Sequence, residues 1–219
     1  MSTSQLTDYD QFAAEWHATR RQTWGELAFS QPLLKSPQIL DAGCGNGRLL
    51  TFLHQKNFSG AYLGVDLSKK LLEFAQKDFP QAQFRQVDIA NFCASQQFTG
   101  IFCIAVLHHF AEHQTQEKVL ENFYQSLKPG GQIFLTNWNL WQMKFWPYLA
   151  ASLRAGRFRD CRIPFGKQKI PRQLFALRKK DLRQILTKIG FREIQIFYAS
   201  GAQKTSIWKA RNLICLARK

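Results

Sequence analysis

The sequence predicts an α/β protein, a Rossmann-like sandwich on a mostly parallel seven-stranded sheet with an antiparallel C-terminal edge. Three observations lead to this prediction. Short apolar strands alternate with helices through the first two thirds of the chain, which is typical of right-handed βαβ crossovers. A glycine-rich loop follows the first strand, and further acidic residues follow the next two strands. The chain has 219 residues, of which 45% are hydrophobic, enough for one domain over residues 1–219.

The elements follow in order from the N-terminus. Apolar residues at helical spacing predict a helix from Tyr9 to about Phe29, which would form a helical lid over residues 1–30. Ser68 suits the N-cap of one of the helices that follow. The fourth strand is nearly all apolar, as expected of a central parallel strand. The predicted strands are residues 38–42, 61–66, 84–89, 101–107 and 132–138, and the helices between them are residues 46–56, 68–78 and 117–127.

The alternation stops after the fifth strand. Residues 139–175 are rich in aromatic, basic and turn-forming residues, and we interpret them as an insertion. A helix is predicted over residues 178–189, followed by strands at residues 191–198 and 212–217. We expect these two strands to pair as the antiparallel edge of the sheet.

Composition excludes several classes of protein. No run of about 18 apolar residues predicts a transmembrane helix, and residues 1–10 lack the basic start and apolar centre of a secretory signal. The five cysteines have no metal-ligand spacing, so we expect reduced thiols, no metal and a cytoplasmic location.

The strongest motif is Asp41-Ala42-Gly43-Cys44-Gly45-Asn46-Gly47, between the first strand and a helix. Glycines there permit a tight turn and let a ligand touch the backbone. Asp66 ends the second strand, where a carboxylate can accept both ribose hydroxyls, and Asp88 ends the third. Two alternatives are a sandwich without a cofactor and a nucleotide-binding dehydrogenase. The glycine spacing disfavours the dehydrogenase.

Over residues 9–138 these features resemble the class I S-adenosylmethionine-dependent methyltransferases. Lys128-Pro129-Gly130-Gly131, before the fifth strand, is a further hallmark of that family. The resemblance implies S-adenosyl-L-methionine as the cofactor, with its methionine part on the glycine loop. Asp66 would bind the ribose, Asp88 the adenine amino group, and Ile89 would pack on the ring. The cofactor-binding residues expected are Asp41, Gly43, Cys44, Gly45, Asn46, Gly47, Asp66, Leu67, Asp88, Ile89 and Ala105.

A narrower resemblance lies in Ile104-Ala105-Val106-Leu107-His108-His109-Phe110 and in Thr19-Arg20-x-x-x-Trp24, with Tyr9 and Phe12 ahead of them. These residues look like those of the tRNA methyltransferases that esterify 5-carboxymethyluridine at the wobble position. Asn137-Trp138 stands where the fifth strand of that family ends. The Ala-Val-Leu-His-His part also occurs in small-molecule methyltransferases, so a small-molecule or lipid-like O-methyltransferase is the alternative function.

Esterification of a carboxylate needs no general base, because the nucleophile is ionised at neutral pH. A cation would help to hold that carboxylate, and Arg20 is the candidate, with a helix-end ion pair as the alternative. His108 is a candidate for substrate or cofactor contact, unless its ring only satisfies backbone groups. Asn137 is the third candidate catalytic residue, and Trp138 beside it would either stack on a base or be buried.

Two motifs of other methyltransferases are absent. No Asn/Asp-Pro-Pro-aromatic motif follows the fourth strand, which disfavours methylation of amino groups, and no Pro-Cys pair supplies a thiolate nucleophile. The chain also departs from the wobble-uridine family. Where that family has an Arg-Tyr-Tyr-His-like stretch, residues 170–175 read Ile-Pro-Arg-Gln-Leu-Phe. The family's eukaryotic members work with a small activator protein, which is therefore a possible partner.

Charge is distributed unevenly. Residues 1–143 hold 11 Lys/Arg and 12 Asp/Glu, a net of −1, whereas residues 144–219 hold 19 Lys/Arg and 3 Asp/Glu, a net of +16. This asymmetry favours a polyanionic partner, and we expect tRNA to bind the basic C-terminal half. Two alternatives remain for the helically spaced Trp141, Phe145, Leu149 and Leu153: part of the core, or an interfacial membrane helix.

Overall fold

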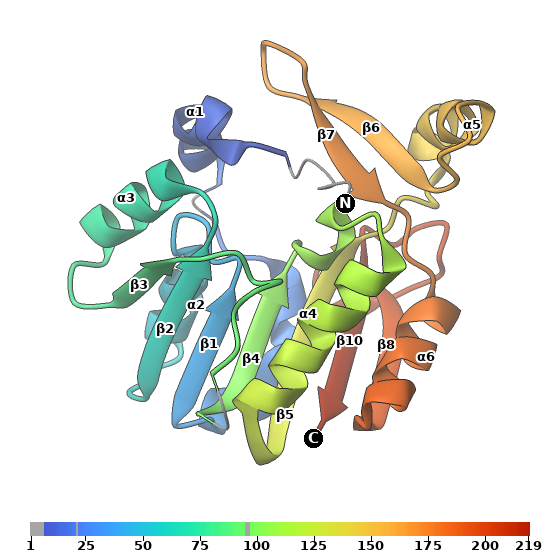
Figure 1. The fold of residues 1–219 in the computed structure, drawn as a ribbon. Coiled ribbons are helices and arrows are strands. Elements are labelled where there is room, and N and C mark those ends of the chain that lie inside the picture. Colours follow the sequence, from blue (N-terminus) through green and yellow to red (C-terminus); the bar gives the residue numbers. More distant parts are fainter. Residues whose placement is uncertain (1–6, 21, 95–96) are drawn as a thin grey trace.

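The computed structural model describes residues 7–20, 22–94 and 97–219, so residues 1–6 and 21 of the expected lid lie outside it. Its main sheet has the strand order β3-β2-β1-β4-β5-β10-β8-β9 (Figure 1). In chain order these strands are β1 (Gln38–Ala42), β2 (Ala61–Asp66), β3 (Gln83–Gln86), β4 (Phe98–Ile104), β5 (Leu127–Trp138), β8 (Arg192–Ser200), β9 (Gln203–Lys204) and β10 (Asn212–Arg218).

Pairing within the sheet confirms the predicted fold class. The five strands from β3 to β5 are parallel, and β10 runs antiparallel to both β5 and β8. The two-residue strand β9 adds one edge strand to the seven that the sequence predicts. Because the five parallel strands end on one side of the sheet, their carboxyl ends meet along a single edge.

Helices cover both faces of the sheet. They are α1 (Ala13–Thr19), α2 (Arg48–Gln55), α3 (Lys69–Asp78), α4 (His113–Ser126), α5 (Trp146–Arg154) and α6 (Lys179–Ile189), with 3-10 helices η1 (Tyr9–Phe12), η2 (Gly25–Lys35), η3 (Leu107–His109) and η4 (Met143–Phe145). Successive residues of β4 point to opposite faces, so Cys103 packs with α4 and α6 while Phe102 packs with α2 and η2. No helix in these ranges is long and apolar enough to span a membrane.

The N-terminal segment is not the continuous helix that we predicted. Helix α1 ends at Thr19, whose hydroxyl donates to the carbonyl oxygens of Glu15 (2.8 Å) and Trp16 (3.2 Å). Such side-chain bonds compete with helix continuation. Arg20 is therefore the C-cap residue of α1 and lies just beyond the helix.

Two strands end earlier than predicted. Strand β3 stops at Gln86, and Asp88 begins a turn in which its carboxylate accepts from the amide of Ala90 at 2.9 Å. Strand β4 stops at Ile104 because Ala105 adopts a left-handed backbone with φ of 59°, which turns the chain into η3. The functional residues predicted at these strand ends thus lie on turns.

The insertion over residues 139–175 contains α5 and a β-hairpin that the sequence analysis missed. Strands β6 (Asp160–Phe165) and β7 (Ile170–Phe175) pair antiparallel and form a second sheet above the carboxyl edge of the first (Figure 1). Pro164 and Pro171 face each other in that register. Proline cannot donate to a strand ladder, so the pattern did not indicate strands. Trp141, Phe145 and Leu149 pack on this unit, as in the core alternative, whereas Leu153 is 63% exposed.

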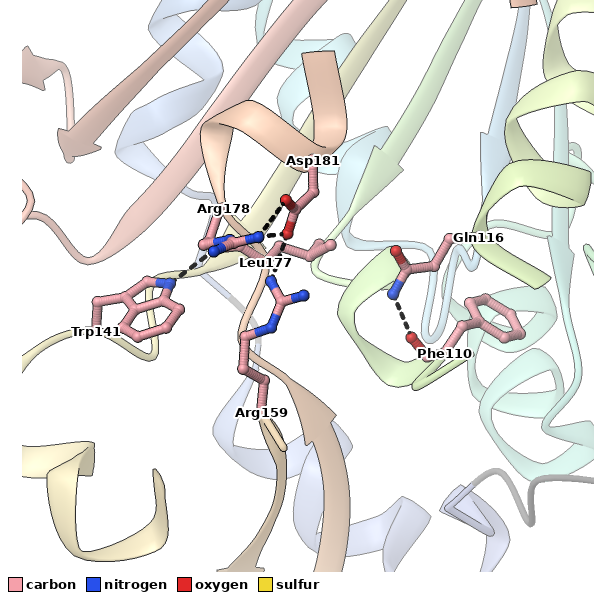
Figure 2. A network of polar contacts seen from close by, with 7 residues as sticks. All are labelled: Phe110, Gln116, Trp141, Arg159, Leu177, Arg178 and Asp181. Carbon is pink, nitrogen blue, oxygen red and sulfur yellow. Dashed lines mark hydrogen bonds and ion pairs between the residues drawn. The ribbon is translucent and has the colours of Figure 1, made fainter. Parts of the chain in front are cut away.

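A polar network anchors the hairpin to α6 (Figure 2). The buried carboxylate of Asp181 pairs with Arg159, the residue before β6, and with Arg178, whose Nη2 lies 2.7 Å from Oδ1. Burial alone would raise the pKa of Asp181, but the hydrogen bonds from Arg178 and Arg159 outweigh it and lower that pKa. Nearby, the indole of Trp141 donates to the carbonyl oxygen of Leu177 at 3.0 Å. The hairpin is thereby fixed over the sheet.

Candidate cofactor and acceptor site

The glycine loop follows β1, and its backbone conformation is constrained. Gly43, Gly45 and Gly47 all have positive φ, between 55° and 79°. The amides of Gly43 and Cys44 donate to the carbonyl oxygen of Val65 at 2.7 and 3.0 Å. A Cβ at Gly43 would lie 2.3 Å from Val106 Cγ2, whereas one at Gly45 would meet nothing closer than 3.9 Å. The loop is therefore tightly packed at Gly43 and open to a ligand at Gly45.

Asp66 connects this loop to the end of β2. Its two carboxylate oxygens accept from the amides of Gly45 (2.7 Å) and Ser68 (2.9 Å). Each oxygen has a further lone pair, so it can also accept a bond from a ligand hydroxyl. Burial raises the pKa of Asp66, and the backbone hydrogen bonds oppose that rise. Ser68 is also the N-cap of α3, as predicted, and accepts from the amide of Leu71 at 3.1 Å.

A pocket begins at this loop and continues past the ends of β2, β4 and β5. Ten of the predicted site residues line it: Arg20, Gly43, Cys44, Gly45, Asn46, Asp66, Leu67, Asp88, Ile89 and Ala105. Trp138, for which the sequence left base stacking and burial open, also lines the pocket. The other lining residues were not among the predicted site residues: Thr7, Tyr9, Trp16, Trp24, Arg48, Leu71, Val87, Ile104, Val106, His109 and Phe110.

Four predicted site residues do not line the pocket. Asp41 is 2% exposed and accepts from the hydroxyl of Tyr62 at 2.8 Å, beneath the glycine loop. Burial raises the pKa of Asp41 to about 7, against the effect of the Tyr62 hydrogen bond. Gly47 begins α2 under Phe79 and Ala75. His108 and Asn137 are buried behind the wall of the pocket.

The two adjacent histidines have different positions. His109 lines the pocket, and its Nε2 forms a hydrogen bond of 3.0 Å with the hydroxyl of Tyr9. Its Nδ1 lies 3.3 Å from the carbonyl oxygen of Gln173. His108 packs between His109 and Trp138, with ring centroids 4.7 and 5.9 Å away. Burial lowers the pKa of His109 to about 4 and that of His108 well below its usual range. Both rings are therefore neutral at physiological pH.

Segments distant in sequence form the rest of the pocket wall. Arg20 lies over the ring of Trp16 at 4.8 Å and over that of Phe165 in β6 at 5.6 Å. Arg48 lies 3.2 Å from the ring centroid of Trp24. Asn46 links the loop to the N-terminal segment, since its amide donates to the carbonyl oxygen of Arg20 at 3.2 Å. The pocket thus has a cofactor end, made by the glycine loop and the acids, and an acceptor end, made by aromatic residues and arginines.

The cofactor end fits S-adenosylmethionine. Open backbone at Gly45 can approach the methionine part, and Asp66 retains lone pairs for ribose hydroxyls. Asp88 and the apolar Ile89 lie together on the next turn, in place to take an adenine amino group and ring. The carboxylates of Asp66 and Asp88 also suit a cationic ligand.

Comparison with known proteins agrees with this geometry. Residues 39–131 match the family described as "Methyltransferase domain". The chain is 32% identical over 132 residues to a tRNA (carboxymethyluridine(34)-5-O)-methyltransferase of Arabidopsis thaliana, a match that covers 59% of this chain and 31% of that protein. A trans-aconitate 2-methyltransferase of Escherichia coli is also 32% identical, over 105 residues, 48% of this chain and 40% of that one. The chain therefore spans less than half the length of either relative.

Solved structures share the fold. An S-adenosylmethionine-dependent methyltransferase from Methanosarcina mazei superposes with a TM-score of 0.69 at 16% identity, covering 83% of this chain and 92% of its own. One from Archaeoglobus fulgidus gives 0.68 at 15%, covering 95% and 100%. The recognition from sequence is confirmed: residues 39–131 match a methyltransferase domain, and the fold is that of solved S-adenosylmethionine-dependent methyltransferases, which imply this cofactor.

Proposed function

We propose that this S-adenosylmethionine-dependent methyltransferase acts on tRNA and esterifies the carboxylate of 5-carboxymethyluridine at the wobble position. The observation that carries the proposal is the composition of the acceptor end, where Arg20 and Arg48 lie on aromatic rings, while the carboxylates that line the pocket, Asp66 and Asp88, belong to the cofactor end. Such a surface suits an anionic group on a stacked base. The curated relative from Arabidopsis thaliana is named for that substrate.

The chain's residues need only bind and orient the reactants. S-adenosylmethionine, when bound, supplies the electrophilic methyl group. A carboxylate acceptor is ionised at neutral pH, so no general base is required. This agrees with His109, whose ring nitrogens face the Tyr9 hydroxyl and the Gln173 carbonyl oxygen rather than an acid, and with His108, which is buried. The aromatic wall of Tyr9, Trp16 and Trp138 excludes water and holds the acceptor close to the glycine loop.

The basic C-terminal half is the proposed tRNA surface. Exposed cations of α5, the hairpin and α6 flank the acceptor end: Arg154, Arg157, Arg162, Lys167, Lys169, Lys179, Lys180 and Arg183. Arg159, Arg172 and Arg178 are not counted here, because the first two are shielded and Arg178 is paired with Asp181. Phosphates would be neutralised by this surface, so tRNA affinity should fall steeply with salt. A small activator protein remains a proposed partner without an assigned surface.

The test is transfer of labelled methyl from S-adenosylmethionine to total tRNA, followed by mild base treatment of the product. The proposal expects labelled tRNA whose label is released by base, as a methyl ester requires. Label that resists base would retain tRNA as the substrate but reject the carboxylate. The Asp66→Ala variant is the control, since it should abolish any transfer that depends on the cofactor site.

A second candidate function is methylation of a small polycarboxylate. The relative from Escherichia coli named for trans-aconitate favours it, and both named substrates carry a carboxylate. Salt dependence separates the two candidates. Transfer to tRNA should weaken steeply between low and physiological salt, whereas transfer to a small acid bound by few ion pairs should change far less.

A further inference from the structure

Arg172, in β7, is a buried cation without an anionic partner. Its side chain belongs to a residue that is only 3% exposed. In the described part of the chain, no carboxylate forms an ion pair with it, and its Nε has no hydrogen-bond partner. Burying an unpaired guanidinium is costly, because the charge loses its hydration. A feature of this cost requires an explanation.

The guanidinium lies beside the acceptor end of the pocket, next to its lining residues. Its carbon is 4.8 Å from the ring centroid of Trp138 and 4.6 Å from that of Phe165. Trp138 lines the pocket, whereas Arg172 and Phe165 do not, and Phe165 also lies under Arg20. Tyr9, another lining residue, is also a neighbour of Arg172. Arg172 therefore adjoins the acceptor end through two of its wall residues.

Cation–π contacts alone do not account for the arginine. Such contacts stabilise a cation less than the loss of hydration destabilises an uncompensated buried ion. Burial lowers the pKa of Arg172, and the charge of Arg20 lowers it further. Two cations thus lie close together where the residues that the structure describes place no carboxylate in an ion pair with either of them. The complementary charge would come from a ligand.

We propose that Arg172 binds the carboxylate of the methyl acceptor and so selects anionic acceptors. This inference rests on the proposed function, because it assigns the carboxylate-binding residue of that reaction. It gives Arg172, rather than Arg20, the main part of the role expected from the sequence. The backbone carbonyl oxygen of Arg20 accepts from the side chain of Asn46 in the glycine loop, so Arg20 also holds the N-terminal segment to that loop.

The chemistry follows from this arrangement. Arg172 holds one carboxylate oxygen, and the other forms a bond to the methyl carbon as the carbon–sulfur bond breaks and its electrons pass to sulfur. The products are the methyl ester and S-adenosylhomocysteine, and no proton is transferred. The carboxylate charge is greatest before the reaction and disappears in the ester. Arg172 thus contributes to binding and orientation of the substrate more than to the transition state, and it releases the neutral product.

The test compares Arg172→Gln with Arg192→Gln, a matched substitution of an exposed strand arginine in β8 that belongs neither to the pocket lining nor to the proposed tRNA surface. Calorimetry in the presence of S-adenosylhomocysteine would measure binding of three probes: 5-carboxymethyluridine, its neutral amide 5-carbamoylmethyluridine, and trans-aconitate. The wild type should prefer the acid over the amide by about tenfold or more. Arg172→Gln should lose this preference and raise KM more than it lowers kcat, while Arg192→Gln should retain the preference and both kinetic constants.

Thermal unfolding gives a second measurement, because a ligand-binding role and a structural role of Arg172 predict opposite changes in the unfolding midpoint. Arg172→Met removes an uncompensated charge and keeps the packing, so its midpoint should equal or exceed that of the wild type. A drop of several degrees would mean that Arg172 supports the fold and would overturn the proposal. Retention of the acid preference in Arg172→Gln, or binding of neither acid by the wild type, would overturn it as well.

The outcomes also separate this inference from the proposed function. Binding of trans-aconitate that depends on Arg172, without binding of 5-carboxymethyluridine or label on tRNA, would reject the tRNA substrate and retain Arg172 as the carboxylate site. Label on tRNA that is released by base, and that Arg172→Gln leaves unchanged, would retain the function and reject the role of Arg172.

Discussion

The two ends of the pocket are constructed differently. The cofactor end is made by backbone: three glycines with positive φ and the amides that hold Asp66 lie within residues 43–68. The acceptor end is lined by side chains from the N-terminal segment, η3 and β5, which are distant in sequence, and the hairpin packs against them. One short loop can bind a cofactor that is common to many enzymes. An acceptor differs between enzymes, so it is bound by segments that can vary independently of that loop.

The sharpest test of the cofactor end is Gly43→Ala. The new Cβ would lie 2.3 Å from Val106 Cγ2 on a backbone with φ of 79°, so the loop must move. We expect no measurable binding of S-adenosylmethionine by calorimetry. Gly156→Ala is the control, since Gly156 has a similar φ of 69° but an added Cβ there meets nothing within 4 Å. Equal affinity of the two variants would show that Gly43 does not position the cofactor.

Asp66→Ala should have the next largest effect. It removes the carboxylate that bonds both the loop and the proposed ribose, so cofactor affinity should fall about 100-fold, or ~2.7 kcal/mol. Asp78→Ala, at the exposed end of α3, should leave affinity unchanged. Unchanged calorimetric affinity in Asp66→Ala would remove this residue from the site.

Asp41 tests whether the cofactor end also depends on pH. Its pKa in the folded chain is about 7, above the usual value of 3.8, so the folded state binds the extra proton. The protonated Asp41 carboxyl contributes its full stabilisation of the folded state below about pH 4, and this contribution is lost as pH rises through 7. Between pH 5 and pH 8, the wild type should lose about 2 kcal/mol of unfolding free energy relative to Asp41→Asn. Denaturant titrations with parallel pH profiles would contradict this.

Asp181→Asn is directed at the acceptor end alone. Without the carboxylate, Arg159 and Arg178 lose their shared partner, which should cost about 1.5 kcal/mol because the site is partly solvated. The hairpin would lose its anchor to α6, so KM for the acceptor should rise while cofactor affinity stays constant. An equal loss at both ends would show that the two ends are not separable.

The smallest effect is expected at the basic surface. Reversing the charges of Lys179 and Lys180 to Glu should weaken tRNA binding about fivefold at physiological salt, or ~1 kcal/mol, and reduce its salt dependence. Arg178 is left intact, because it is paired with Asp181. Filter binding at three salt concentrations would measure this. Binding that is unaffected would place the tRNA surface elsewhere.

The same difference explains what the sequence predicted. Gly43, Gly45 and Asp66 lie in a local pattern whose geometry follows from short-range backbone requirements, so the cofactor end was predictable. His109 rather than the candidate His108 lines the pocket because of the turn at Ala105, whose left-handed φ no pattern indicated. Arg172 was read as part of a divergent stretch, because its neighbours Trp138 and Tyr9 are brought to it only by the tertiary fold.

The hairpin was missed for a different reason. Its strands carry Pro164 opposite Pro171, and its inward residues, among them Cys161 and Leu174, pack on a small cluster of their own rather than on the main core. A periodic pattern of apolar residues indicates strands that pack on a large core. It therefore predicts the strands of the main sheet better than those of a hairpin with a small core of its own. The basic and aromatic composition of the insertion was evident, but the position of those residues over the pocket was not.

The N-terminal segment and the hairpin meet above the pocket. Phe165 contacts Phe12 and Trp16, with ring centroids 5.0 and 5.5 Å apart, and the amide of Gln173 donates to the hydroxyl of Thr7 at 3.1 Å. These two segments together cover both ends of the pocket, and we expect a single opening between them for product release, cofactor exchange and acceptor exchange. One opening motion would then limit turnover, and a substitution that weakens the Phe165 contacts would change the rates of all three steps together.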